Sequence, residues 1–217
     1  MPGILEQASC KPPLIFLTMP NHHLIYIPGL HDQVPPKPWL GQVLPLFWRG
    51  RGFIGHIMAP RWEQGEFGPK LQVILDKIDE LTAQGHTVSL VGQSAGSSLG
   101  LNAFAARLDH VVGLVILTGR LRVAGQPSLA QAAKTSPAFA ESVRRAEITL
   151  SKLTASNLRR IMTIRPSTDK LVPATSVPIS GATNRVSQLR GHSFGGAMMA
   201  SFASAQWLSF LEQARLR

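Results

Sequence analysis

The chain is poor in cysteine and in charged residues. Cys10 is its one cysteine, so no internal disulfide can form and the fold does not depend on an oxidising compartment. Only 16% of the 217 residues are charged and 44% are hydrophobic, a balance that excludes an intrinsically disordered chain. The apolar run LIFLTM near the N-terminus is too short for a signal core or a membrane span, and no basic leader precedes it. We therefore expect neither export nor anchoring, and favour a cytoplasmic location.

Acidic residues are scarce relative to basic ones. The chain has 12 Asp and Glu and 22 Lys and Arg, a formal net charge of +10. Such a charge would suit a nucleic-acid binder, a protein that binds anionic membranes or an enzyme for acidic substrates. The densest basic segment has a single aromatic residue, Phe139, and so lacks the aromatic interleaving of a nucleic-acid binder. We predict a solvated helical face that binds no nucleic acid, and contact with a membrane surface stays open. Between residues 119 and 160, only Glu141 and Glu147 oppose Arg120, Arg122, Lys134, Arg144, Arg145, Lys152, Arg159 and Arg160.

Strand-like and helix-like segments alternate along most of the chain. Short apolar runs predict strands at 23–27, 52–60, 87–92, 111–119 and 160–166, and a more polar last strand is expected at 185–189. Amphipathic or small-residue segments predict helices at 70–85, 97–108 and from about 197 to 216. This alternation is typical of an α/β fold with a mostly parallel central sheet of about six strands and helices on both faces. We expect one domain over residues 1–217, with a short helical basic insertion at about 119–160.

Three serines stand in overlapping or separate Gly-x-Ser-x-Gly matches, and only one has the context that a nucleophile needs. Ser94 lies between a buried strand and a helix, where a tight turn exposes the hydroxyl. Ser98 comes one helical turn later, so its hydroxyl should bond to a carbonyl inside the helix. Ser193 follows a polar strand and has no acid or histidine after it. Because a serine hydroxyl is a weak nucleophile without a base, we expect Ser193 to cap the final helix instead.

A base and an acid for Ser94 follow the next two predicted strands. Asp169 comes after the strand at 160–166, and His192 comes after the strand at 185–189. The carboxyl ends of parallel strands meet at one edge of a sheet, where ligands bind. We therefore predict that Ser94, Asp169 and His192 converge there as nucleophile, orienting acid and general base.

At these residues the sequence resembles the α/β-hydrolase superfamily. VSLVGQSAG looks like its nucleophile elbow, DKLVP like its acid loop, the Gly-His pair at 191–192 like its histidine loop, and IPGLHD like its oxyanion loop. The resemblance runs from about residue 22 to the C-terminus and implies a small form similar to lipases and esterases, with the 119–160 segment in the place of a cap. It also implies an oxyanion hole made by the backbone N–H groups of Leu30 and Ala95. Candidates for substrate contact are Gly29, His31, Asp32 and Gln93.

Together these features predict a serine hydrolase that cleaves a carboxylic ester or related acyl bond through an acyl-enzyme on Ser94. The expected partner is a small-molecule acyl ester, and no cofactor is needed. No metal site is expected, because the remaining histidines are scattered without ligand spacing. Esters, thioesters, amides and acyl transfer all remain open, since one triad serves them all. The alternative is a catalytically inactive protein of the same fold that binds an anionic partner through its basic segment.

Overall fold

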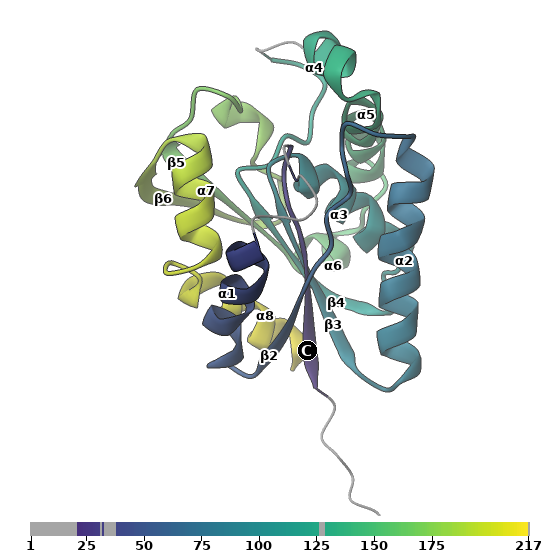
Figure 1. Cartoon of the computed structure of the whole chain (residues 1–217), viewed down its shortest axis with the longest axis vertical. Coiled ribbons are helices and arrows are strands. Elements are labelled where there is room, and N and C mark those ends of the chain that lie inside the picture. Colours follow the sequence, from purple (N-terminus) through teal and green to yellow (C-terminus); the bar gives the residue numbers. More distant parts are fainter. Residues whose placement is uncertain (1–20, 31, 33–37, 126–128, 217) are drawn as a thin grey trace, which may run out of the picture.

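Six parallel strands form one sheet at the centre of the molecule. The computed structural model describes residues 21–30, 32, 38–125 and 129–216 (Figure 1). The strand order is β2-β1-β3-β4-β5-β6, and every neighbouring pair is parallel, as the alternation of apolar runs and helices predicted. The strands are β1 (His22–Ile27), β2 (Phe53–Ile57), β3 (Thr87–Gln93), β4 (Val111–Leu117), β5 (Ile161–Thr168) and β6 (Thr183–Arg190).

The inner strands are buried on both faces, which explains their nearly unbroken apolar sequences. In β1, Leu24 and Tyr26 pack into one core cluster, whereas Ile25 and Ile27 pack into the other. Side chains alternate between the two faces of a strand, so a strand covered on both sides needs apolar residues at consecutive positions.

Two layers of helices provide that cover. Helices α1 (Pro38–Arg49), α7 (His192–Ala200) and α8 (Ala205–Arg215) lie on one face of the sheet, and α2 (Phe67–Ala83), α3 (Ala95–Ala106) and α5 (Pro137–Leu150) lie on the other (Figure 1). No helix within the described ranges is long and apolar enough to cross a membrane.

The segment between β4 and β5 contributes one of these covering helices. It comprises α4 (Leu129–Thr135), α5 and α6 (Ala155–Leu158). Helix α5 packs against α3: the Ser142 hydroxyl donates to Ser98 Oγ at 2.9 Å, and Asn102 Nδ2 donates to the Ser142 carbonyl at 3.0 Å. Part of this segment therefore belongs to the hydrophobic core, because the buried side of α5 helps to cover one face of the sheet.

The basic residues of this segment divide into two kinds. Arg144 and Arg145 are exposed and lie 3.5 and 2.7 Å from Glu141 on the outer side of α5. Arg120 is only 4% exposed, and its guanidinium donates to backbone carbonyls of the following loop. Arg160 likewise donates to two carbonyls of the connection into β4. The predicted solvated face is wrong for Arg120, whose charge is used to hold a loop together.

The C-terminal segment forms two helices where the sequence predicted one. Helix α7 begins at His192, directly after Gly191 turns the chain with a φ of 78°, and ends at Ala200. The carbonyls at its end accept hydrogen bonds from two indoles: Trp48 Nε1 donates to Ala200 and Trp207 Nε1 to Met199, both at 2.8 Å. These donors come from α1 and α8, so the break depends on tertiary packing that the local sequence does not reveal.

Candidate active site

Ser94 lies between β3 and α3 in a backbone conformation that residues other than glycine rarely adopt. Its φ of 53° and ψ of −117° place it on a sharp turn. The Ser94 amide donates to the Leu117 carbonyl at 2.8 Å, which ties the turn to the end of β4. The next residue of that strand end, Thr118, also has a positive φ of 52° and is fully buried. Two strained residues thus meet at adjacent strand ends, as is common at functional sites.

The glycines around Ser94 are explained by close backbone approaches. A Cβ atom on Gly96 would lie 2.0 Å from the Ile27 carbonyl oxygen, and one on Gly92 would lie 2.5 Å from the Ser97 Cα atom. No side chain fits at such distances. The Gly-x-Ser-x-Gly pattern at this position therefore reflects the packing of α3 against β1 and β3.

His192 contacts both Ser94 and Asp169. His192 Nε2 lies 2.7 Å from Ser94 Oγ, and His192 Nδ1 lies 2.8 Å from Asp169 Oδ2. Asp169 comes directly after β5, and His192 is the first residue of α7, just past β6. The two side chains are 8% and 11% exposed. The structure thus brings together the three residues that the strand order predicted would converge.

The carboxylate of Asp169 is held in place by its own loop. Its Oδ1 accepts hydrogen bonds from the Leu171 and Val172 amides at 2.8 and 3.0 Å. Oδ2 is left facing the imidazole of His192. A carboxylate only accepts hydrogen bonds, so it favours the tautomer with the proton on Nδ1. Nε2 is then free to accept the proton of Ser94.

The loop after β1 passes directly beside Ser94. A Cβ atom on Gly29 would lie 2.8 Å from Ser94 Cβ and 3.2 Å from its Oγ. Leu30 follows in the same loop, and Ala95 is the first residue of α3. The amide of a first helical residue has no carbonyl partner within the helix, so it is available to a ligand. His31, a predicted substrate contact, lies outside the described residues.

This loop is braced by a second loop, at residues 60–62. Trp62 Nε1 donates to the Pro28 carbonyl at 3.1 Å. The carboxylate of Asp32 accepts from the Arg61 and Trp62 amides at 2.7 and 3.2 Å. Asp32 was a candidate for substrate contact, but its carboxylate joins the two loops. The role of Trp62 was not predicted from the sequence. The available signal was that the indole N–H of a buried tryptophan needs an acceptor.

Comparison with known proteins addresses the fold. No family model and no curated protein matches the chain. Among solved structures, Est1E from Butyrivibrio proteoclasticus has a TM-score of 0.62 and 13% identity, covering 91% of this chain and 90% of that one. The monoacylglycerol lipase of Paleococcus ferrophilus has a TM-score of 0.59 and 13% identity, covering 88% and 94%. A thioesterase domain from the curacin biosynthetic pathway has a TM-score of 0.56 and 12% identity, covering 88% and 91%.

All three neighbours have the fold that the sequence motifs suggested. This chain has the α/β-hydrolase fold. The six parallel strands, with Ser94 after β3 and His192 after the last strand, follow the arrangement that the resemblance implied.

The other two candidate serines have different surroundings. Ser98 is fully buried, and its hydroxyl donates to the Ala95 carbonyl at 3.0 Å, in agreement with the structural role predicted for it. Ser193 is exposed in the first turn of α7, where the residue at the cap position is Gly191 and no side chain caps the helix. The prediction that Ser193 caps this helix is therefore wrong, because the helix begins one residue before it.

Gln93 connects the nucleophile strand to the helix that carries His192. Its Oε1 accepts a hydrogen bond from the buried hydroxyl of Tyr26, whose pKa is raised by burial. Its Nε2 lies against Gly196 of α7, where a Cβ atom would approach it to 2.4 Å. Contact between Gln93 and a substrate stays a prediction. The link to Tyr26 has no signal in the sequence, since the two residues are 67 positions apart.

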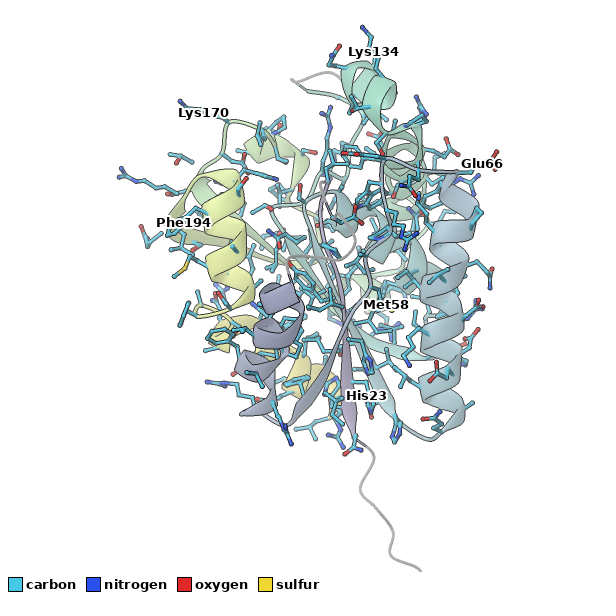
Figure 2. All side chains as sticks on the ribbon, in the orientation of Figure 1. His23, Met58, Glu66, Lys134, Lys170 and Phe194 are labelled. Atoms are coloured by element: carbon cyan, nitrogen blue, oxygen red, sulfur yellow. The ribbon has the colours of Figure 1, made fainter. Side chains whose placement is uncertain are left out.

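The other histidines that the structure describes gather at the opposite end of the sheet, where Figure 2 labels His23. His23 stacks between His56 and His86, with His23 Nδ1 2.8 Å from His56 Nε2. The buried His22 ring lies 2.7 Å from Ser89 Oγ. In the part of the chain that the structure describes, no group of three or more His, Cys, Asp or Glu side chains could hold a metal ion.

Proposed function

We propose that this chain is a serine hydrolase that cleaves a carboxylic ester or a related acyl bond. The observation that carries the proposal is that His192 engages both partners at once, with Nε2 on Ser94 and Nδ1 on Asp169. Neighbours of the same fold include a metagenome-derived lipolytic enzyme, a monoacylglycerol lipase and a thioesterase domain. Their range supports acyl chemistry and leaves the leaving group open.

The first half of the reaction forms an acyl-enzyme. Ser94 Oγ attacks the substrate carbonyl while its proton passes to His192 Nε2, and the positive imidazolium is stabilised by Asp169. The tetrahedral intermediate then collapses. The bond to the leaving alkoxide or thiolate breaks, and His192 returns the proton to that group.

The negative oxygen of the intermediate needs donors beside Ser94. The amides of Ala95 and Leu30 serve this purpose in our proposal, one from the start of α3 and one from the braced loop. Fixed backbone donors stabilise the transition state more than the ground state, since charge on this oxygen develops only during attack.

The second half regenerates the enzyme. His192 Nε2 takes a proton from water, the hydroxide attacks the acyl carbonyl, and collapse returns the proton to Ser94 Oγ with release of the carboxylic acid. Each step uses only side chains and backbone amides of the chain, so the proposed cycle involves no cofactor.

Hydrolysis of short-chain nitrophenyl esters tests the proposal. We expect the Ser94→Ala variant to lose activity by about 10³-fold or more, whereas Ser193→Ala, the matched control, should keep it. A fluorophosphonate probe followed by mass spectrometry should find the adduct on Ser94. An adduct on Ser193, or equal rates for the wild type and Ser94→Ala, would contradict the mechanism, and equal rates would favour the idle binding protein. Parallel assays with acyl thioesters distinguish the leaving group.

A further inference from the structure

An exposed apolar surface begins next to the proposed base. Helix α7 has no charged residue in its sequence after His192, and Phe194 is 67% exposed. Met198 follows one turn later on the same side of the helix, and Phe202, 72% exposed, comes at the end of this line. The line therefore runs from the active site along the whole outer side of α7.

Helix α1 continues this surface. Phe47 contacts Phe202 with ring centroids 4.6 Å apart in an edge-to-face arrangement. Leu46, beside it, is 60% exposed, while Trp48 on the inner side is buried and anchors α1 to the end of α7. We call the set Leu46, Phe47, Phe194, Met198 and Phe202 the α1–α7 face. Protruding phenylalanines in a continuous apolar surface mark a binding site for something apolar.

The charges around the α1–α7 face are mainly basic. Helices α1 and α7 contain no acidic residue. Basic residues border the two helices at the end of α1, in the turn after it, on β6 and after β5: Arg49, Arg51, Arg185, Arg190 and Lys170. None of the five forms an ion pair with another described residue. Arg185 pairs in register with Ile164, which places it on the side of the sheet that α7 covers.

Most acidic residues of the described chain lie elsewhere, apart from Asp169 beside His192 and Glu212 on α8. Eight of them are on the elements of the opposite layer or in the loops that lead into it: Glu63, Glu66, Asp76, Asp79, Glu80, Asp109, Glu141 and Glu147. In Figure 2, Phe194 and Lys170 lie on the α7 side of the molecule, and Glu66 lies at the start of α2 across from them. The α1–α7 face is therefore bordered mainly by cations, whereas the opposite layer carries charges of both signs, with Lys70, Lys77, Arg144 and Arg145 beside its acids.

We propose that the α1–α7 face docks on an anionic lipid surface. Exposed phenylalanines enter the boundary between headgroups and acyl chains, and the surrounding arginines and lysine meet anionic headgroups. A second copy of this chain fits less well, because a two-fold contact through this face would set its cations against one another. Docking is independent of catalysis; only the delivery of a membrane ester to Ser94 rests on the proposed function.

Vesicle cosedimentation tests the docking. Wild type should pellet with phosphatidylcholine vesicles that contain about one third phosphatidylglycerol, and much less so with phosphatidylcholine alone or at about 1 M salt. The Leu46→Asp/Phe202→Asp variant should bind at least about tenfold more weakly. Its matched control is Val73→Asp/Ile148→Asp, which alters side chains of 55% and 56% exposure on the opposite layer and should bind like wild type.

Charge variants provide a second arm that does not depend on how the apolar variants fold. Arg49→Gln with Arg185→Gln should weaken binding to the anionic vesicles by about fivefold per charge, and Arg144→Gln on α5 should not. Equal binding by face and control variants, or no vesicle binding by wild type, would overturn the proposal. So would a dimer in analytical ultracentrifugation that Leu46→Asp/Phe202→Asp converts to a monomer. Ser94→Ala should bind vesicles like wild type, so the failure of the hydrolase proposal and of the docking proposal are separable.

Discussion

The indole nitrogen of Trp62 lies 3.1 Å from the Pro28 carbonyl oxygen, and this hydrogen bond joins a fully buried side chain to the loop beside Ser94. Together with the two amide bonds to Asp32, it fixes the segment that carries the Leu30 amide. The position of one proposed oxyanion donor is thus set by a loop some 30 residues away in the chain.

We predict that Trp62→Phe lowers kcat for nitrophenyl esters by about ten- to hundredfold with little change in KM, because a displaced oxyanion donor weakens transition-state binding. The control is Phe139→Leu, which removes an aromatic neighbour of the same indole but no hydrogen bond. It should lower thermal stability and spare kcat. An unchanged kcat in Trp62→Phe would show that the brace does not position the loop.

Gly96→Ala should abolish activity and destabilise the fold by about 1–3 kcal/mol or more, since the added methyl meets the Ile27 carbonyl at 2.0 Å. Gly68→Ala is the matched control. Gly68 lies in the first turn of α2 with open space around it, so alanine should leave activity unchanged and stabilise the helix slightly. Urea unfolding and ester hydrolysis measure both effects, and an active Gly96→Ala variant would show that the turn can relax.

Asp169→Asn should keep the loop, because an amide oxygen can still accept from the Leu171 and Val172 amides. It should nevertheless lower kcat by about 10³- to 10⁴-fold, because an amide N–H facing Nδ1 favours the wrong tautomer of His192. Asp109→Asn, in the connection from α3 to β4, is the control and should be fully active. A mild effect of Asp169→Asn would mean that the carboxylate does not orient the base.

The fold should become less stable in acid because of His22, a buried histidine at the end of the sheet opposite Ser94. Burial, assisted by the charge of Arg215 and by His23, lowers the pKa of His22 from its ordinary 6.5 to about 4. Below pH 6.5 the His22 imidazole is protonated in the unfolded chain, whereas in the folded chain it stays neutral down to about pH 4. This group alone therefore costs up to about 3 kcal/mol of stability over that window.

Urea titrations between neutral pH and pH 4 measure this loss. The His22→Gln variant should be less stable at neutral pH, since the contact with Ser89 changes, but its stability should decline less steeply in acid. Equal slopes in the variant and the wild type would assign acid sensitivity to other groups.

Features that are encoded in a short stretch of the sequence were predictable. The inner strands were, because a parallel strand buried on both faces must be a short apolar run between turns. The more polar edge strand β6 followed from its place in the alternation of strands and helices. The meeting of Ser94, Asp169 and His192 was also predictable. Each follows a strand, and parallel strands end at the same edge.

Features that depend on distant partners were not predictable. The break after Ala200 depends on indoles from α1 and α8, and the polar link between Tyr26 and Gln93 spans 67 positions. Arg120 belongs to the most basic segment, yet its burial is decided by the carbonyls of a loop that only the folded chain assembles. No window of local sequence contains both halves of such contacts.

Helix α7 is held by indoles at one end and carries the imidazole of His192 at the other. The alignment of the base with Ser94 is therefore set by how α1 and α8 dock, far from the reacting atoms. Undocking of these helices would release His192 while the sheet, with its fully buried central strands, stays intact. As denaturant is added, the chain should lose its activity before it loses its β-structure, so inactivation would report the detachment of one helical layer.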